Sequence, residues 1–140
     1  MPAAMSKDES HEFLDDRPGW MQFTSIGPDG YPHTVPIGFF RMGDDLYTGG
    51  RASTQRAKNI ARDPRVSALF ETGGSMDDIK GLLVQGDAEM VTDAAAVLIL
   101  MREAWKQRGA EGDAPAEAPP GTAYIRIVPR RYISWDYSKP

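Results

Sequence analysis

The chain of 140 residues is long enough for one domain with a hydrophobic core and too short for two of ordinary size. With 41% hydrophobic and 26% charged residues, it has the composition of a folded globular protein, which excludes a disordered chain. A net charge of -4 argues against a general nucleic-acid-binding protein, and the absence of cysteine excludes disulfides, zinc-thiolate sites and thiol nucleophiles.

The N-terminal segment is polar. It lacks the apolar core of a signal peptide, and no run elsewhere approaches the roughly 18 apolar residues of a membrane span. We therefore expect a cytoplasmic protein with no membrane or nucleic-acid partner. Residues 1–12 are expected to be flexible, with a short helix near Glu9 to Asp15, and either Met1 or Met5 fits the native start.

Short strands joined by turn residues follow this segment. "WMQFTSI" (20–26) alternates apolar and polar side chains, and "GPDG" (27–30) places Pro, Asp and Gly at turn positions, which predicts a hairpin. The next strand, "YPHTVPIGFF" (31–40), contains Pro32 and Pro36, which cannot donate to a sheet ladder. We therefore expect this strand at an edge or a bulge of the sheet, where a ligand could lie against it.

A basic segment, "GGRASTQRAKNIARDPRV" (49–66), comes after an apolar "LYT". It carries five basic side chains against one acid, a net charge of +4 that leaves -8 for the rest of the chain. Ser53 or Thr54 can cap a helix that runs to Asp63, and Pro64 stops it. The basic residues are Arg51, Arg56, Lys58, Arg62 and Arg65.

The charges at the start of this helix oppose its dipole. A helix N-terminus carries about half a positive charge and prefers acids in its first turn, yet Arg51, Arg56 and Lys58 crowd that end. Free N–H groups, hydroxyls and cations together favour a phosphate or another small anion as ligand. A solvated surface helix fits the same pattern, and the segment has no phosphate-loop or dinucleotide fingerprint, so both interpretations stay open.

Two more strands are predicted, at 66–71 and 79–91. The longer one contains Gly81 and Gly86, although glycine weakens a strand. These glycines indicate sharp coiling or the close approach of another group. The pattern favours a curled sheet over a flat one.

One long helix interrupts the strand pattern. Asp93 caps a predicted helix over residues 94–108, and the Pro- and acid-rich loop 109–121 that follows is expected to be mobile. The final segment, from residue 124, predicts one or two strands broken at Pro129. Several short strands and a late helix together predict a small antiparallel barrel with helices packed on it.

Side chains suited to catalysis are few. The chain has two histidines, His11 and His33, and no metal-site spacing, so no metal is expected. His33 fits a structural or pocket-lining role better than that of a general base. Ser53 lies outside any Gly-x-Ser-x-Gly motif, which disfavours an α/β-hydrolase. No catalytic side chain is identified, so a cofactor would bring the chemistry of an enzyme.

Three segments in order, "GYPHTVPIGFF", "DDLYTGGRASTQRAKNIARDPRVSALFE" and "KGLLVQGDAEMV", resemble the flavin-binding split-barrel family. This family includes pyridoxamine-5'-phosphate-oxidase-like and deazaflavin (F420)-dependent oxidoreductases, and "KNIARDPRV" is similar to its "RNLRRDPRV". The resemblance covers about residues 13–91 and the final "RIVPRRYISWD". It implies a mainly β fold with helices, a six-stranded antiparallel split β-barrel in a single domain over residues 1–140, usually as a homodimer with cofactor sites at the interface.

The resemblance also implies where the cofactor would lie. Its phosphate would bind where a strand, a turn and the helix start meet, and its ring would lie along the second strand. Gln55 stands where pyridoxamine-phosphate oxidases usually have arginine, and Thr54 where deazaflavin binders often have it, so FMN and F420 both stay open. The residues assigned in this way are Thr34, Val35, Pro36, Ile37, Thr48, Arg51, Ser53, Thr54, Arg56 and Lys58, with Lys80 and Trp135 reaching the partner's cofactor. Plain interface packing fits Trp135 equally well.

Three functions follow from this resemblance. The first is an FMN-dependent oxidoreductase that moves hydride between a reduced nicotinamide and a small organic substrate. The second is an F420-dependent reductase on the same fold, in which the longer acidic tail of the cofactor would use Arg51, Lys58 and Arg62. The third is a non-catalytic flavin- or haem-binding module.

Overall fold

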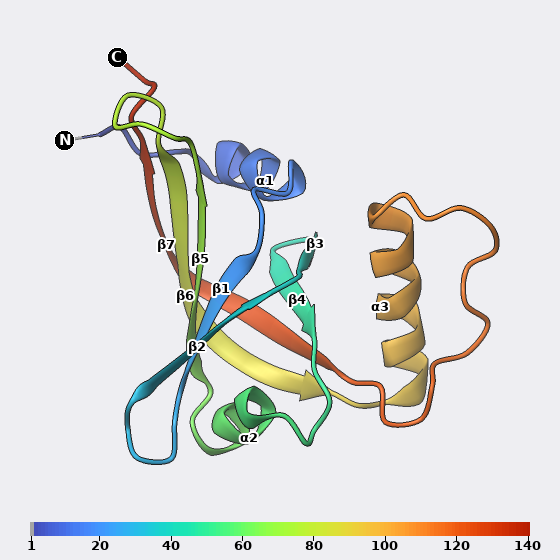
Figure 1. Ribbon diagram of the computed structural model, residues 1–140. Coiled ribbons are helices and arrows are strands. Elements are labelled where there is room, and N and C mark those ends of the chain that lie inside the picture. The colour runs from blue at the N-terminus through green and yellow to red at the C-terminus, as the bar shows by residue number, and fades with distance from the viewer. Residues whose placement is uncertain (1) are drawn as a thin grey trace.

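The seven strands in residues 2–140, the part of the chain that the computed structural model describes, form one antiparallel sheet in the order β2-β1-β5-β6-β7-β4-β3 (Figure 1). The strands are β1 (Met21–Ile26), β2 (Pro32–Ile37), β3 (Phe40–Met42), β4 (Asp45–Gly49), β5 (Arg65–Thr72), β6 (Lys80–Val91) and β7 (Tyr124–Asp136). The helices are α1 (Lys7–Asp15), α2 (Gln55–Arg62) and α3 (Ala94–Gln107). The sheet curls into the predicted split barrel, with seven strands in place of six.

The extra strand comes from the proline-containing segment. Gly38 and Phe39 separate β2 from β3, and β3 then pairs with β4, with Phe40 opposite Tyr47. β2 pairs with β1 alone, so it is an edge strand. The prediction of an edge position for Pro32 and Pro36 is therefore confirmed, because an edge strand has a side on which no donor is needed.

β6 and β7 form the long hairpin around which the sheet curls. β7 runs continuously through Pro129, and the pairing register with β6 shifts there, so that Arg130 is an extra residue in the ladder. A Cβ atom at Gly86 would overlap the carbonyl oxygen of Val128, and one at Gly81 would overlap the Trp135 ring. The predicted close approaches at both glycines are confirmed, and a bulge accommodates Pro129 without ending the strand.

The main hydrophobic core lies inside the curl of the sheet. Phe23, Phe70 and Leu82 are almost fully buried there, with Leu14 of α1 and Ile60 of α2 closing the two ends of the core. β5 contributes every second residue, Val66, Ala68 and Phe70, as expected for a strand with one face on the core. The other sheet face keeps half-exposed apolar side chains at Leu69, Leu83 and Ile133.

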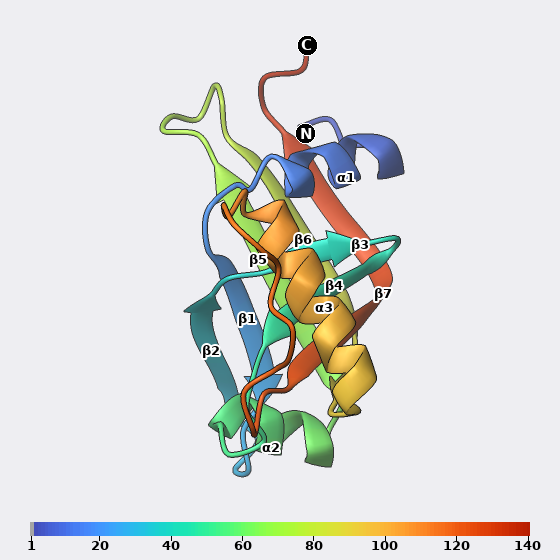
Figure 2. The ribbon, with the colours of Figure 1, turned by 90° about the vertical axis from the view of Figure 1, so that its right-hand side faces the viewer.

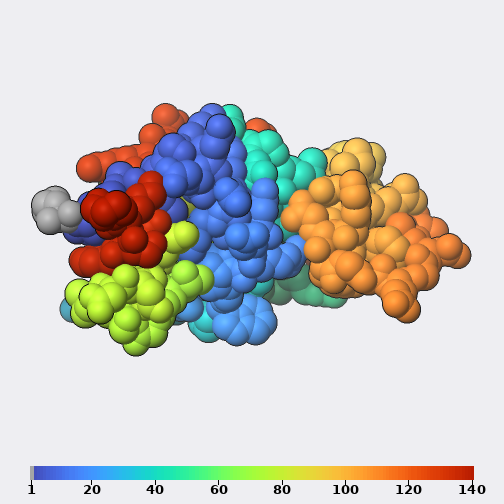
Figure 3. Space-filling view, turned by 90° about the horizontal axis from the view of Figure 1, so that it is seen from above, coloured from blue at the N-terminus to red at the C-terminus, as the bar shows by residue number. Residues whose placement is uncertain are grey.

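α3 stands on a separate, smaller cluster. Its buried residues Val97 and Leu100 pack with Phe40, Tyr47 and Tyr124. Figure 2 shows α3 crossing in front of the sheet, and Figure 3 shows it projecting with its loop from the side of the molecule opposite the termini. This cluster is small and separate from the main core. α3 and the loop that follows it therefore pack on the outside of the barrel and form a side wall. None of the helices in residues 2–140 is long and apolar enough for a membrane crossing.

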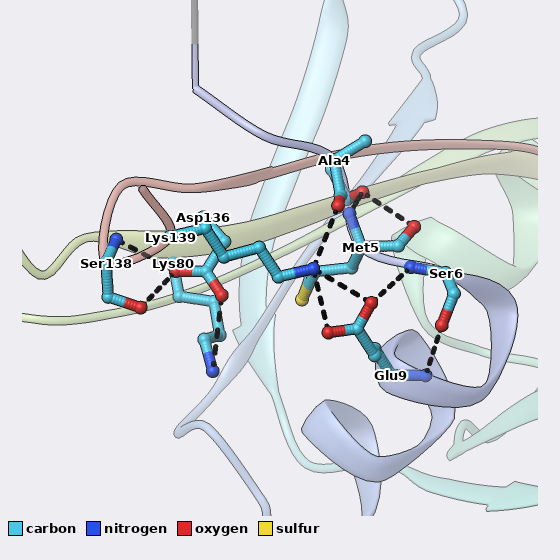
Figure 4. A network of polar contacts seen from close by, with 9 residues as sticks. Ala4, Met5, Ser6, Glu9, Lys80, Asp136, Ser138 and Lys139 are labelled. Atoms are coloured by element: carbon cyan, nitrogen blue, oxygen red, sulfur yellow. Dashed lines mark hydrogen bonds and ion pairs between the residues drawn. The ribbon is translucent and has the colours of Figure 1, made fainter.

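The two chain ends are joined by polar contacts (Figure 4). Ser6 caps α1 in a capping box with Glu9, and the Glu9 carboxylate also accepts a hydrogen bond from Lys139 Nζ at 2.9 Å. Lys139 donates as well to the carbonyl of Ala4. The helix predicted near Glu9 to Asp15 therefore begins earlier, at Lys7, within the segment expected to be flexible. Met1 lies outside the described residues, and mobility of the N-terminal segment and of loop 109–121 stays a prediction.

Lys139→Ala is expected to raise the pKa of Glu9, which the Lys139 hydrogen bond and then the Ser6 amide lower from 4.5 to about 2. Because the pKa is lower in the folded state, this contribution to stability is present above pH 4.5 and is lost as the pH falls toward 2. An NMR titration of the Glu9 carboxyl carbon in the wild type and in the variant measures the two pKa values. An unchanged Glu9 pKa in the variant would contradict the contact, and Lys106→Ala, on α3, serves as the control.

Candidate functional site

The basic segment forms the start of α2 as predicted. Thr54 is the N-cap, with its hydroxyl accepting from the Ala57 amide at 3.3 Å and donating to the Arg51 carbonyl at 2.8 Å. The first turn contains no acidic residue. Ile60 anchors the helix on the core, and the buried Asn59 side chain donates to the Ser25 hydroxyl at 3.0 Å. These contacts hold the helix start, with its unused N–H groups, at one end of the barrel.

Four of the five basic side chains in this segment have no acidic partner among the described residues. Arg65 pairs with Asp63, and its hydrogen bonds hold the pKa of Asp63 at about 2. Arg56 and Arg62 donate to backbone carbonyls of Gly49 and Ile26, and Arg51 contacts the carbonyl of Pro120 at 3.4 Å; Lys58 is exposed. The positive charge at the start of α2 is therefore not neutralised within residues 2–140, which fits an anion-binding site and also fits a solvated surface helix.

A pocket of about 550 Å³ opens beside this helix start. Four of the predicted site residues line it: Pro36, Ile37, Thr48 and Arg56. The pocket wall includes the end of edge strand β2, the Gly38–Phe40 connection and the end of β4. Its size is in the range of cofactor and small-molecule sites. The structure thus brings the ring-binding and phosphate-binding parts of the prediction to one cavity.

Arg56 has a polar atom that the protein leaves without a partner. Its Nη2 donates to the Gly49 carbonyl at 2.9 Å, whereas its Nε is buried and makes no hydrogen bond within the described residues. A buried donor without a partner costs free energy, on the order of 1–3 kcal/mol. An anion in the pocket would satisfy this donor. Arg56 is therefore the residue of the site that most directly indicates a ligand.

The hydroxyl groups of the predicted phosphate site have internal partners. Thr48 is buried and donates to the Gly38 carbonyl at 2.7 Å, and Thr54 is occupied as the N-cap. Ser53 is exposed. Thr48 therefore shapes the pocket wall, and Ser53 has the hydroxyl that is freer to meet a ligand at the helix start.

Two further predicted residues, Thr34 and Val35, lie on opposite faces of β2. Val35 packs against the main core, together with Ile37. Thr34 is exposed, and its hydroxyl lies 2.8 Å from that of Thr24 on β1. Neither lines the pocket. In this chain alone, the pocket therefore meets only the C-terminal end of β2.

Lys80 and Trp135 lie far from the start of α2. Figure 1 shows their strand ends, at the start of β6 and the end of β7, near the chain termini and opposite α2. Lys80 Nζ is 3.7 Å from the buried Asp136 carboxylate (Figure 4), whose pKa is held below its ordinary value first by the Ser138 hydroxyl and also by Lys80. Trp135 covers Gly81 on the outer sheet face. These two residues do not meet the pocket of their own chain.

The pocket also has walls that the sequence patterns did not reveal. Phe39 and Phe40 follow β2, and Arg17 and Trp20 come from the α1–β1 connection. Arg108 and Tyr124 lie at the two ends of the connection between α3 and β7. Arg17 has a positive φ of 53°, which is uncommon for a residue with a side chain, and Trp20 is 68% exposed. In the sequence, the signal for these walls was a tryptophan directly after the turn-forming "DDRPG".

Comparisons with known proteins agree with the fold. A family model described as "Pyridoxamine 5'-phosphate oxidase" matches residues 6–136. The chain is similar to the crystal structure of conserved hypothetical protein Rv2991 from Mycobacterium tuberculosis, with 29% identity, a TM-score of 0.84 and coverage of 95% of this chain and 86% of that one. It also shares its fold with an F420 reductase, with 22% identity, a TM-score of 0.67 and coverage of 87% of this chain and 94% of that one. A FAD-binding protein from Mesorhizobium loti has the same fold, with 19% identity, a TM-score of 0.71 and coverage of 96% of each chain. No curated protein matches the sequence.

Proposed function

The chain belongs to the pyridoxamine 5'-phosphate oxidase family, and on this basis we propose that it is an FMN-dependent oxidoreductase acting on a small organic substrate. The observation that carries the proposal is the buried, unpartnered Nε of Arg56 in the wall of a pocket beside an α2 start without acids. A charged phosphate suits both features, because it accepts hydrogen bonds from guanidinium and free helix N–H groups.

The residues present fit a flavin-type cofactor. Arg56, Ser53 and the first N–H groups of α2 would bind the phosphate, and the backbone of Pro36 and Ile37 would orient the ring. Phe39 and Phe40 would exclude water from that side of the pocket. The bound cofactor would supply the hydride-transfer chemistry. Within a protomer, Thr48 supports the wall by holding the Gly38 carbonyl.

We also propose that two copies of the chain associate through the outer face of the sheet. Leu69, Leu83 and Ile133 are half-exposed there, and Trp135 lies on the same face. Lys80 and Trp135 are remote from the pocket of their own chain, so a second copy is required if they are to reach a cofactor. Sedimentation at equilibrium should give a dimer, and Trp135→Ala should weaken it; a monomer at micromolar concentration would contradict this.

Parallel titrations of the purified protein with FMN and F420 test the cofactor proposal. We expect one of them to bind, followed by the cofactor's absorbance, and a reduced nicotinamide or F420H2 to drive reduction of an acceptor. If neither compound binds, the proposal fails. Tight binding without turnover of any reductant and acceptor pair would support a non-catalytic carrier instead.

F420 is the second candidate because the positive charge continues beyond Arg56. Arg51 and Lys58 carry no acidic partner among the described residues, and a longer acidic cofactor tail could reach them. The F420 reductase that shares the fold is consistent with this candidate.

Lys58→Ala should therefore distinguish the two cofactors. If the tail of F420 meets Lys58, the variant should weaken F420 binding about two- to fivefold, as expected for an exposed charge pair, and FMN binding less. Fluorescence titration at low salt measures both affinities, with Lys106→Ala on α3 as a matched loss of one exposed positive charge. Equal effects on FMN and F420 would count against the F420 version.

A further inference from the structure

Three arginines line the same pocket, and they come from three separate parts of the chain. Arg56 belongs to α2, Arg17 to the α1–β1 connection, and Arg108 to the C-terminal end of α3. No acidic residue lines this pocket, and the side chains of Arg17 and Arg108 make no ion pair or hydrogen bond within residues 2–140. A cofactor phosphate at α2 accounts for Arg56 and leaves the other two cations without a role.

The C-terminal end of α3 and Arg56 meet the β3–β4 hairpin at different places. Gln107 donates to the carbonyl of Arg41, which lies opposite Leu46 near the start of β4, whereas Arg56 donates to the carbonyl of Gly49 at the end of β4. Figure 1 shows the last turn of α3 and the end of α1 near one end of the molecule, with α2 near the other. Arg17 also borders a neighbouring depression formed with Glu103 and Gln107, near the C-terminal end of α3. Arg17 and Arg108 therefore both line the pocket near the C-terminal end of α3, whereas Arg56 lines it from α2.

The backbone at Arg17 is held in a conformation that costs free energy. Its φ of 53° is the only positive value for a non-glycine residue in the described chain, and Pro18 follows it. Glycine would relieve this strain, yet the residue present carries a long cationic side chain into the pocket wall. The positive φ itself is explained by the end of α1, because Arg17 follows the C-cap Asp16 and its amide donates to the Leu14 carbonyl, as is common where a helix ends in the left-handed region.

Aromatic side chains share this pocket with the three arginines. Trp20, Phe40 and Tyr124 line the pocket, and Trp20 is 68% exposed although large apolar side chains are usually covered. Burial raises the pKa of the Tyr124 phenol, and the charge of Arg108 acts in the opposite direction, which places the guanidinium within electrostatic reach. A protonated phenol can donate a hydrogen bond to an anion.

We propose that Arg17 and Arg108 form a second anion subsite, which holds a carboxylate or phosphate group of a small planar substrate whose ring lies against Trp20 and Phe40. The inference rests on the proposed function, because the molecule held there would be the redox substrate. It names the substrate class: an aromatic or conjugated compound with one anionic group. Specificity comes from the guanidinium groups, which a neutral analogue would leave unpaired.

The test uses cofactor-free full-length protein and three probes that share one ring system: 2-naphthoate, 2-naphthyl phosphate and neutral 2-naphthamide. Isothermal titration calorimetry should show at least one anionic probe binding about tenfold or more tightly than the amide. A comparison of the affinities for 2-naphthoate and 2-naphthyl phosphate shows which anionic group the subsite prefers. Equal affinities for the amide and both anions, or no binding of any probe, would overturn the proposal.

Arg17→Gln and Arg108→Gln should each weaken the preferred anionic probe about tenfold and leave the amide unchanged. Lys106→Gln removes one positive charge from the same helix outside the pocket and should have no effect. Circular dichroism shows whether each variant is folded. If Arg17→Gln does not fold, Arg108→Gln still tests the subsite. Affinities equal to wild type in Arg108→Gln would refute the subsite.

Cofactor titration of Arg108→Gln separates this inference from the proposed function. We expect its affinity for FMN or F420 to stay within twofold of wild type, because the cofactor phosphate lies at α2. A loss of cofactor affinity of about tenfold or more, the size expected when Arg56 is replaced by alanine, would assign Arg108 to the cofactor site. That result would overturn the subsite. Probe binding as expected in a protein that binds neither cofactor would refute the proposed function alone.

Discussion

Arg56→Ala is expected to lose most of the affinity for the cofactor and little of the folding stability. The variant removes the buried Nε that has no partner within the described chain and the charge that faces the pocket beside α2. A hydrogen bond to a charged group contributes on the order of 1.5–3 kcal/mol, so the dissociation constant should rise roughly ten- to hundredfold. Titration followed by cofactor absorbance or fluorescence gives the value.

Arg65→Ala is the matched control for this experiment. Arg65 belongs to the same basic segment, but it is paired with Asp63 and does not line the pocket. Its replacement should change cofactor affinity less than twofold, which separates a local contact from a loss of general positive charge. If Arg56→Ala binds the cofactor as tightly as wild type, the phosphate lies elsewhere and the proposed site is wrong.

Phe70→Ala is expected to lower the free energy of unfolding by about 3–5 kcal/mol, the usual cost of removing a buried phenyl ring. Phe70 is 1% exposed at the centre of the main core. Its ring meets that of Phe39 edge to face, with centroids 4.6 Å apart, and Phe39 lines the pocket. The substitution should therefore also loosen the pocket wall and weaken cofactor binding.

Urea denaturation followed by circular dichroism measures this loss. Met76→Ala, at a side chain that is 65% exposed in the β5–β6 loop, should stay within about 0.5 kcal/mol of wild type. A loss below 1 kcal/mol for Phe70→Ala would mean that the ring is not packed as described. Normal cofactor affinity in a folded Phe70→Ala protein would show that the wall formed by Phe39 does not depend on Phe70.

Local patterns identified the elements around the site. Thr54 as a possible cap and Pro64 as a stop were sufficient for α2, because capping and the proline effect act within a few residues. Pro32 and Pro36 indicated an edge strand for a similar reason, since a missing donor is a property of the residue itself. The strand count was less accurate, because the pairing that makes β3 separate from β2 is with β4.

Long-range features of the pocket escaped prediction. Arg17, Arg108 and Tyr124 are far apart in the sequence, and no periodicity relates them to Arg56. The partners of the Thr48 and Thr54 hydroxyls were equally hidden, although both residues had been assigned to the phosphate by resemblance. The burial of the Arg56 Nε could not be predicted from the sequence either, because it depends on how Gly49 and the pocket wall pack around the side chain.

The sequence by itself determined the capped α2 with its excess of positive charge and the edge strand β2, because each depends on side chains close together in the chain. The split-barrel class came from the resemblance of several ordered segments to a known family. Only the tertiary structure decided which of those charges face a cavity. It did so by curling β6 and β7 around a bulge at Pro129 and by setting α3 against the open side of the barrel. Those arrangements rest on contacts between distant residues, and such contacts bring Arg17 and Arg108 to the pocket that Arg56 shares.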